Sequence, residues 1–310
     1  MWNWLLDKSI VYAFDRTGFE RHQREFREGD LDASIVDKVC VITGASGGIG
    51  FEVALALAHK KAKVFLLCRN RAKSEKIVAE IQQSTGNPHV YLVVVDMADL
   101  ESVQGAVAAL RPHKIDILVH NAGVLPTEYA VSPQGWENTV ATNIIGHHLL
   151  TRALENNLHN SKIIMVSSGG MYPVTLKNGD LFIQQCPKKF DGVYQYALSK
   201  RAQVVLTELW AKRGNGILAH CMHPGWADTP GVQTSLPGFW NNMANRLRTP
   251  AQGADTIVWL SIADIPREHN GAFWFDRKKQ PTHIFPWQST SAESKQELWC
   301  RLEDIITPYM

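Results

Sequence analysis

Short apolar runs alternate with amphipathic stretches along most of the chain. The apolar runs stop at glycine or polar residues, which is typical of buried strands, and the stretches between them have the apolar spacing of helices. The predicted strands are Val39–Thr43, Lys63–Cys68, Val90–Val95, Ile115–His120, Lys162–Val166, Gly216–Met222 and Ala272–Phe275. The predicted helices are Gly48–Lys60, Arg71–Ser84, Leu100–Leu110, Pro133–Leu158, Tyr194–Arg213 and Thr249–Ala263.

Strands that alternate with helices predict βαβ units joined by right-handed crossovers. We therefore expect an α/β protein with a three-layer, doubly wound Rossmann fold and a parallel sheet of roughly seven strands. Residues 38–310 would form one domain, and residues 1–37 a short N-terminal helical extension that contains no strand. Residues 224–248 lack clear periodicity and are long for a loop, which is typical of a segment that covers a substrate.

Composition narrows the class of protein. The chain has 310 residues, of which 45% are hydrophobic, so it can bury a large core. Its net charge of +2 gives no electrostatic reason to expect a nucleic acid partner. The five cysteines include no CxxC pair, which favours a reduced intracellular protein without a metal site. The sequence sets no oligomeric state.

Residues 1–14 are rich in large apolar side chains, but Asp7 and Lys8 interrupt them. The segment is neither a transmembrane span nor a convincing signal peptide, so we expect a cytoplasmic or peripherally membrane-associated protein. It could form an amphipathic helix on a membrane or partner, or it could pack on the protein's own core. The lack of a strong basic stripe weakens the case for a membrane.

A glycine-rich turn follows the first strand and precedes a helix. In Thr43-Gly-Ala-Ser-Gly-Gly-Ile-Gly50, glycines allow a sharp turn, a close approach to a pyrophosphate and tight packing of helix on strand. The helix N-terminus offers unpaired N–H groups to the phosphates. The cofactor-binding residues expected here are Gly44, Ser46, Gly48, Ile49 and Gly50. The spacing fits both TGxxxGxG and TGxxGxxG, so the loop leaves alcohol and nucleotide-sugar chemistry open.

Arg69 indicates which nicotinamide cofactor binds. An NAD site usually has an acidic residue about 20 residues beyond the glycines, at the end of the second strand. Here Arg69 lies 19 residues beyond Gly50, and no acidic residue lies between Lys63 and Ala72. A guanidinium can hold a 2′-phosphate through paired hydrogen bonds, whereas a carboxylate would repel it. The sequence therefore predicts NADP as the cofactor.

The chain resembles the short-chain dehydrogenase/reductase family, in its compact single-domain form, because seven motifs occur along it in the order found in that family. They are Thr43–Gly50, Asp96, Asn121-Ala-Gly123, Asn143, Ser167-Ser168, Tyr196 with Lys200, and Pro224-Gly225. Val166–Met171, Met222–Val232, Ala251–Asp255 and Phe275–Lys278 are similar to the dehydrogenase/reductase family member 12 group, which is close to the retinol dehydrogenase-like enzymes. The resemblance spans about residues 38–276 and implies an oxidoreductase.

The expected catalytic residues are Tyr196, Lys200, Ser168 and Asn143. Tyr196 and Lys200 stand four residues apart, so they share a helix face, and the lysine cation would lower the pKa of the phenol. Tyr194 has no cation at this spacing. Ser167 and Ser168 face opposite ways on an extended chain, and the resemblance favours Ser168 as the residue that orients the substrate oxygen.

The resemblance also implies the other roles in the site. Asn143 would position a water that links Lys200 to solvent, and Lys200 and Tyr196 would also contact the cofactor. The remaining cofactor-binding residues that it implies are Asp96, Asn121, Ala122, Gly123, Pro224, Gly225 and Thr229. Two departures from the family pattern are His120, where an asparagine is more common, and the spacing of 28 positions from Ser168 to Tyr196, which is longer than in many relatives.

These observations predict an NADP-dependent enzyme that interconverts an alcohol and a carbonyl. Residues 235–248 include Phe239, Trp240 and Met243, which favours a hydrophobic substrate such as a lipid, retinoid or steroid. One alternative is a nucleotide-sugar epimerase or dehydratase, which Arg69 and the lack of a separate C-terminal substrate domain disfavour. Another is a non-catalytic NADP-binding sensor or scaffold, which would be expected to lose Tyr196 or Lys200.

Overall fold

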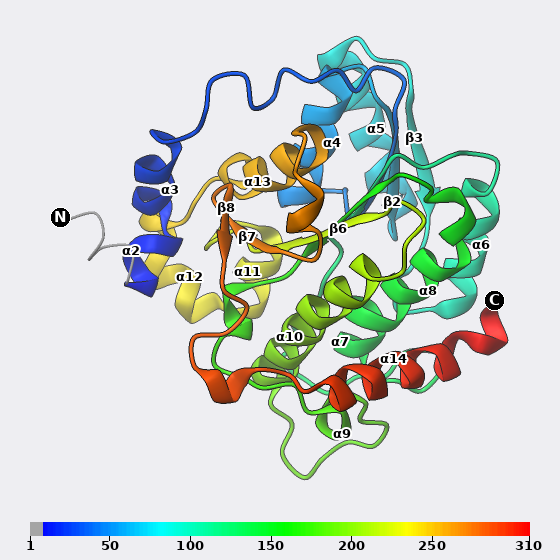
Figure 1. The fold of residues 1–310 in the computed structure, drawn as a ribbon, viewed down its shortest axis with the longest axis vertical. Coiled ribbons are helices and arrows are strands. Elements are labelled where there is room, and N and C mark those ends of the chain that lie inside the picture. Colours follow the sequence, from blue (N-terminus) through cyan, green and yellow to red (C-terminus); the bar gives the residue numbers. More distant parts are fainter. Residues whose placement is uncertain (1–8) are drawn as a thin grey trace.

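An eight-stranded sheet forms the centre of the molecule in the computed structural model, which describes residues 9–310 (Figure 1). The strand order is β3-β2-β1-β4-β5-β6-β7-β8. The strands are β1 (Val39–Thr43), β2 (Lys63–Cys68), β3 (Val90–Val94), β4 (Ile117–His120), β5 (Lys162–Val166), β6 (Leu218–Met222), β7 (Phe273–Phe275) and β8 (Lys278–Gln280). The first seven run parallel, as the alternating pattern predicts.

The expected strand count of about seven was one too low. The added strand, β8, pairs antiparallel with β7 across the two-residue turn Asp276-Arg277. Both turn residues have positive φ, 46° and 59°, the backbone that a tight hairpin turn requires. The sequence reading missed this hairpin because neither residue is a glycine and β8 has only three residues.

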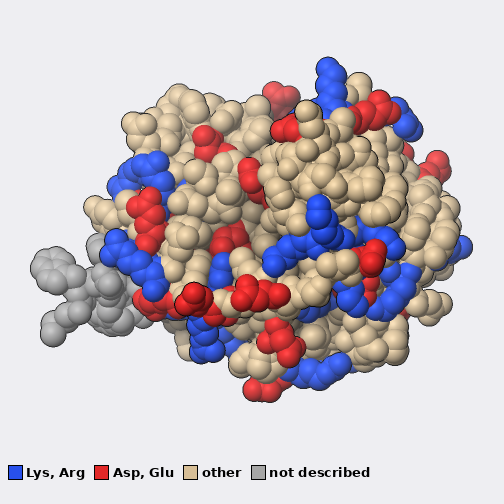
Figure 2. All heavy atoms as spheres, turned by 90° about the horizontal axis from the view of Figure 1, so that it is seen from above, with Lys and Arg blue, Asp and Glu red and all other residues tan. Residues whose placement is uncertain are grey.

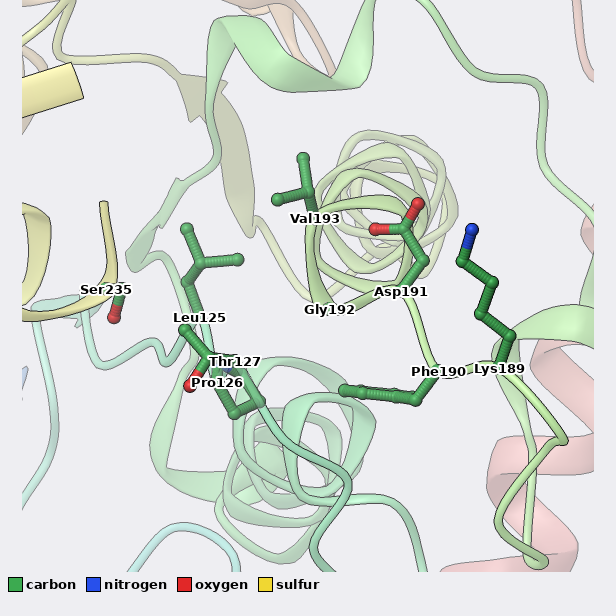
Figure 3. Close-up of a pocket in the computed structure, with 9 residues that line it drawn as sticks. All are labelled: Leu125, Pro126, Thr127, Lys189, Phe190, Asp191, Gly192, Val193 and Ser235. Atoms are coloured by element: carbon green, nitrogen blue, oxygen red, sulfur yellow. The ribbon is translucent and has the colours of Figure 1, made fainter. Parts of the chain in front are cut away.

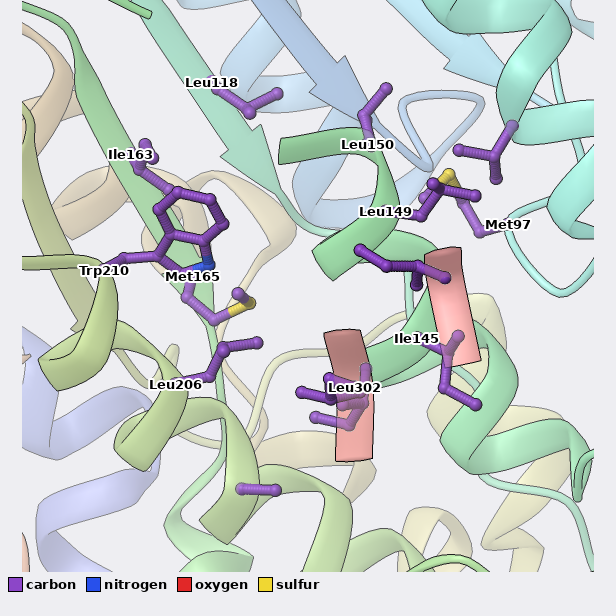
Figure 4. Close-up of a cluster of buried hydrophobic side chains, with 14 of the residues drawn as sticks. Met97, Leu118, Ile145, Leu149, Leu150, Ile163, Met165, Leu206, Trp210 and Leu302 are labelled. Atoms are coloured by element: carbon purple, nitrogen blue, oxygen red, sulfur yellow. The ribbon is translucent and has the colours of Figure 1, made fainter. Parts of the chain in front are cut away.

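Helices cover both faces of the sheet. The longer ones are α4 (Gly48–His59), α5 (Arg71–Thr85), α6 (Leu100–Leu110), α8 (Gly146–Ala153), α10 (Gly192–Ala211), α13 (Pro250–Ile262) and α14 (Ala292–Ile306). Successive β1 residues point to opposite faces, so Val41 joins one buried cluster while Cys40 and Ile42 join the other. The first cluster includes Trp210 and Leu302 beside β4 and β5 (Figure 4). The second lies beneath α4 and α13.

The predicted long helix Pro133–Leu158 is shorter and interrupted. Residues 133–136 form a turn in which Gly135 has φ of 81°, and α7 (Asn138–Val140) begins only after Glu137. The Glu137 carboxylate caps this helix by accepting the N–H groups of Thr139 and Val140. A π-helical turn, Ala141–Ile145, then leads into α8. Periodicity alone cannot locate these breaks because the apolar spacing continues through them.

In residues 9–37 the structure has two short helices, α2 (Ile10–Phe14) and α3 (Arg16–Gln23), and no strand. Part of the segment 1–14, for which a membrane or partner contact was considered, lies outside the described residues. In the described part, Ile10, Val11 and Tyr12 are exposed, whereas the Phe14 ring packs on this protein's own Phe275 at 5.2 Å between ring centroids. Within residues 9–310, no helix combines the length and apolarity needed to cross a membrane.

The segment 224–248 holds two further short helices, α11 (Pro230–Ser235) and α12 (Pro237–Met243). In Figure 1, α12 lies next to the N-terminal helices. On the face shown in Figure 2, basic and acidic side chains are interspersed rather than gathered by sign. That distribution agrees with the near-neutral net charge.

Candidate active site and cofactor site

The glycine loop is packed so tightly that three of its glycines cannot carry side chains. A Cβ on Gly44 would lie 2.9 Å from Ala122 Cα, and one on Gly50 would lie 2.5 Å from Asn121 Nδ2. Gly48 has φ of +56° and lies against Thr229. Gly47 is extended and has more room, so the structure favours the spacing Gly44, Gly48 and Gly50.

The start of α4 fits a dinucleotide pyrophosphate. No side chain caps this helix, so its first N–H groups remain available to an anion. Ile49 turns its side chain away from the loop and packs against Gly253 of α13, which leaves its backbone facing the site. The Ser46 hydroxyl lies at the end of β2, where it interacts with the thiol of Cys68. Burial raises the pKa of this thiol, and contacts with Ser74 and Ser46 oppose the rise.

Thr43 joins the glycine loop to the turn after β4. Its Oγ1 accepts hydrogen bonds from the N–H groups of Asn121 and Ala122, both at 2.9 Å. The Asn121 amide donates to the carbonyls of Thr43 and Gly44 at 2.9 and 3.1 Å. Asn121 therefore holds the loop in shape with its side chain, as a strand-capping turn would. Gly123, two residues on, lies close to Lys200 Nζ.

Arg69 and Asp96 lie together at the open end of β2 and β3. Arg69 Nη1 is 3.6 Å from Asp96 Oδ2, and the Arg69 side chain is 74% exposed. A second cation, Lys73 on α5, places its Nζ 3.4 Å from a Cβ built on Gly47, so it reaches over the glycine loop. Lys73 was not predicted from the sequence, although it lies in the first turn of the predicted helix Arg71–Ser84, which begins two residues after Arg69.

Ser168, Tyr196 and Lys200 meet at the carboxyl ends of β5 and β6. The side chains of Ser168 and Tyr196 are hydrogen-bonded to each other, and Lys200 Nζ lies 5.3 Å from the centre of the Tyr196 ring. The Ser167 hydroxyl turns the other way and donates to the Lys200 carbonyl at 2.8 Å. Of the two serines, only Ser168 faces the phenol.

Burial shifts the pKa values of Tyr196 and Lys200 in opposite directions. Burial raises the pKa of Tyr196, and the hydrogen bond with Ser168 opposes that rise. The Lys200 ammonium is surrounded by protein and donates to the Val166 carbonyl at 2.9 Å, and burial lowers its pKa to about 8. The expected lowering of the phenol pKa by the lysine is not the dominant effect in this structure. Tyr196 therefore keeps its proton at neutral pH.

Asn143 lies within the π-helical turn and is fully buried. Its side chain accepts from the Val124 N–H at 2.9 Å and donates to Ser199 Oγ at 2.9 Å, so it fixes the chain beside Lys200. Its carbonyl contacts His147 Nδ1 at 3.1 Å and accepts from Gln203 Nε2 at 2.9 Å. The wider π turn frees this carbonyl from regular helical bonding.

The segment after β6 packs against the glycine loop, where the cofactor would bind. Thr229 caps α11 by accepting the Val232 N–H at 3.3 Å, and its methyl group lies against Gly48. Gly225 has φ of +71°, and a Cβ there would lie 2.4 Å from Arg248 Nε. The Pro224 carbonyl accepts from Arg248 Nη1 at 3.4 Å. Thr229 thus contacts the glycine loop, whereas Pro224 and Gly225 contact the Arg248 side chain.

A pocket of about 270 Å³ opens at the start of α10, the helix that carries Tyr196. Its walls are the loop after Gly123, the first turn of α10 and the end of α11 (Figure 3). The lining residues are Leu125, Pro126, Thr127, Lys189, Phe190, Asp191, Gly192, Val193 and Ser235. Gly192 is one helical turn, about 6 Å, before Tyr196 on α10. The pocket therefore lies near the start of the helix that carries Tyr196, and its lining does not include Ser168, Tyr196 or Lys200.

Comparisons with known proteins agree with this arrangement. The sequence profile of the short chain dehydrogenase family matches residues 38–177. Dehydrogenase/reductase SDR family member 12 of Bos taurus is 38% identical over 289 residues, which cover 92% of this chain and 90% of that protein. This chain belongs to the short-chain dehydrogenase/reductase family. Retinol dehydrogenase 12 of Bos taurus is also similar, at 32% identity over 89% of each chain.

Solved structures of other proteins have the same fold. An uncharacterized protein from Mycobacterium paratuberculosis superimposes with a TM-score of 0.72 at 24% identity, covering 90% of this chain and 97% of its own. L-Sorbose reductase from Gluconobacter frateurii, complexed with NADPH and L-sorbose, gives a TM-score of 0.64 at 23% identity, covering 79% and 97%. The family assignment makes this chain an oxidoreductase of alcohols and carbonyls that binds NAD(P).

Proposed function

We propose that this short-chain dehydrogenase/reductase interconverts a hydrophobic alcohol and carbonyl with NADP(H). The observation that carries the proposal is the meeting of Ser168, Tyr196 and Lys200 beside a glycine loop that fits a dinucleotide. In this arrangement a proton donor, a hydrogen-bonding hydroxyl and a cation lie close together beside the expected cofactor site.

Each residue has a distinct task in carbonyl reduction. NADPH, when held at the glycine loop by Gly44, Gly48 and Gly50, would supply the hydride for the carbonyl carbon. Tyr196 donates its proton to the carbonyl oxygen, and its raised pKa keeps that proton available at neutral pH. Ser168 holds the same oxygen through its hydroxyl. Lys200 stabilises the phenolate that remains, and Asn143 keeps Lys200 in place through the Val124 turn and Ser199.

The preference for NADP rests on two cations. Arg69 and Lys73 flank the place where the adenosine ribose would lie, and the nearby Asp96 carboxylate is paired with Arg69. A 2′-phosphate would gain charge-assisted hydrogen bonds from both cations.

We expect Arg69→Asp to reverse or abolish the preference for NADPH over NADH, measured as the ratio of kcat/KM values. Arg71→Asp, at an exposed arginine paired with Glu75, is the control and should leave the ratio unchanged. An unaltered ratio in Arg69→Asp contradicts the assignment.

The hydrophobic substrate class is supported by the walls of the pocket and by the relatives. Leu125, Phe190 and Val193 supply apolar surface at the entrance. Similar proteins carry the name retinol dehydrogenase. A screen of aldehydes and ketones with NADPH, followed by absorbance, tests this class. Substrate-dependent loss of absorbance also separates an enzyme from an NADP-binding sensor or scaffold, because a sensor gives none with any carbonyl.

The nucleotide-sugar alternative has weaker support. After β6 the described chain forms only short helices, the β7–β8 hairpin, α13 and α14, and no separate substrate domain lies in residues 9–310. The pocket at the start of α10 contains Lys189 but no cluster of cations that would match a nucleotide diphosphate. Turnover of a UDP-sugar, with no reduction of apolar carbonyls, would favour that alternative.

A further inference from the structure

The N-terminal segment reaches the active site with one aromatic ring. A Cβ built on Gly169, the residue after Ser168, would lie 2.4 Å from Cε2 of Phe14, so the Phe14 ring rests directly on Gly169. A Cβ on the next residue, Gly170, would lie 3.4 Å from Ser168 Oγ and 4.0 Å from Cε1 of Tyr196. Phe14 is therefore separated from the expected proton donor by one short stretch of backbone.

Phe14 is the first of three aromatic side chains that pack against one another in a row next to the site. Its ring meets Trp226 edge-on at 6.0 Å between centroids, and Trp226 meets Phe239 of α12 edge-on at 5.1 Å. All three rings are only partly buried, so each leaves apolar surface uncovered. The row joins the N-terminal segment to the segment 224–248. Edge-on aromatic pairs of this kind hold one another in fixed orientations.

A fully buried arginine holds the segment in this position. Arg248 donates to the carbonyls of Ala13 at 2.8 Å, Phe14 at 2.9 Å and Asp15 at 3.1 Å. These carbonyls lie at the C-terminal end of α2, where helix geometry leaves carbonyls free to accept other donors, and the Asp15 carbonyl also accepts from the Phe19 N–H at 3.3 Å. The Asp276 carboxylate accepts two hydrogen bonds from the Arg248 guanidinium, at 2.6 and 2.9 Å.

Hydrogen bonds from other parts of the chain fix the same position. The N–H of Trp226 donates to the Phe14 carbonyl at 2.8 Å. Arg246 Nε donates to the Asp15 carboxylate at 2.9 Å. A Cβ on Gly225 would lie 2.7 Å from the Phe14 carbonyl, so the chain can dock only where this residue is a glycine.

We propose that Ile10–Gln23 is part of the substrate site, where Phe14 forms the apolar wall next to Ser168 and buried Arg248 positions it. The occupant of this wall is the apolar part of a carbonyl or alcohol substrate, so the inference deepens the proposed function and rests on it. Phe14 contacts the substrate, whereas Arg248 acts through Phe14. The wall supplies selectivity for apolar chains at a place where Gly169 offers only backbone.

The test measures binding without turnover. Decanal is titrated by calorimetry into the full chain saturated with NADP⁺, a pairing that cannot reduce the aldehyde. We expect Phe14→Ala to weaken decanal binding about tenfold or more, and Phe14→Leu to restore most of it. Phe26→Ala is the matched control, because Phe26 belongs to the same extension but packs on Arg277 at 4.1 Å, and its binding should match the unaltered protein.

A second pair of variants separates contact from folding. Gly169→Ala forces the Phe14 ring aside, so it should weaken decanal binding alone but have little further effect in the Phe14→Ala background. Unchanged binding in Phe14→Ala, additive losses in the double variant, or no decanal binding by the unaltered protein each overturns the inference. Failure of the proposed function is read separately, as the absence of decanal-dependent loss of NADPH absorbance.

Discussion

Asp276→Asn tests how the molecule holds its N-terminal segment. The change keeps the size of the side chain but removes the negative charge that faces Arg248. The two side chains are 1% and 3% exposed, and their closest atoms are 2.6 Å apart. Removing one partner of a buried ion pair leaves the other charge uncompensated, which costs about 3–5 kcal/mol. We therefore expect a loss of about this size in the free energy of unfolding, measured by urea titration.

The chain offers a matched control for this prediction. Lys278 and Glu25 also join the hairpin region to the extension with a closest distance of 2.6 Å, but they are 49% and 57% exposed. Exposed pairs contribute about 0–1 kcal/mol, so Lys278→Ala should shift the urea midpoint little. Similar losses in the two variants, or a loss below about 1 kcal/mol in Asp276→Asn, would refute the reasoning that burial gives the Arg248 pair its strength.

The same pair predicts a dependence of stability on pH. Burial alone would raise the pKa of Asp276, but the hydrogen bond with His22 and the charge of Arg248 lower it below its ordinary value. A carboxyl with a lowered folded pKa stabilises the fold above its unfolded pKa of about 3.9 and loses that contribution as pH falls through the folded value. Asp276→Asn should remove this part of the acid sensitivity.

Three further predictions follow from other contacts. Hydrogen bonds with His148 and Arg152 overcome the effect of burial and lower the pKa of Glu303 to about 2. Glu303→Gln should therefore lower the free energy of unfolding by about 1.5–3 kcal/mol in a urea titration, and it should remove the stability that the unaltered protein loses as pH falls toward 2. An unchanged urea midpoint contradicts this prediction. Gly216→Ala should lower the melting temperature, since a Cβ would lie 1.9 Å from Asn160 Oδ1 at φ of +72°; an unchanged melting temperature would mean that the loop relaxes freely. With the pKa of Lys200 near 8, kcat/KM should fall above about pH 8 as the ammonium loses its proton, and Lys200→Arg should remove this limb from the pH profile.

Local sequence patterns predicted the central sheet well. The bounds of β1, β2 and β5 agree with the predicted runs, because apolar strands that end at glycine or polar residues leave a strong local pattern. The helix α14 was missed, although its buried Leu298, Leu302 and Ile306 recur every four residues. The expected tyrosine, lysine and serine do lie together, since parallel strands bring their carboxyl ends to one edge of the sheet.

Long-range contacts were beyond the reach of the sequence. Arg248 looked like a loop residue, but it is fully buried against carbonyls more than 230 positions earlier in the chain. Phe14 looked like one apolar residue among many, and only the folded chain brings it onto Gly169. Neither contact leaves a local spacing, because each depends on how the extension crosses the end of the sheet.

The central claim is that Tyr196 transfers the proton in an NADPH-dependent reduction. Tyr196→Phe keeps the ring and removes the acid, and the measurement is kcat with a carbonyl substrate at saturating NADPH. Tyr194→Phe is the control, because the Tyr194 hydroxyl donates to Asp180 at 2.9 Å and has no lysine four residues on. We expect kcat to fall by about 10²–10⁴ in Tyr196→Phe, with unchanged NADPH affinity and a normal rate in the control. A rate in Tyr196→Phe within about tenfold of the unaltered protein would contradict the account.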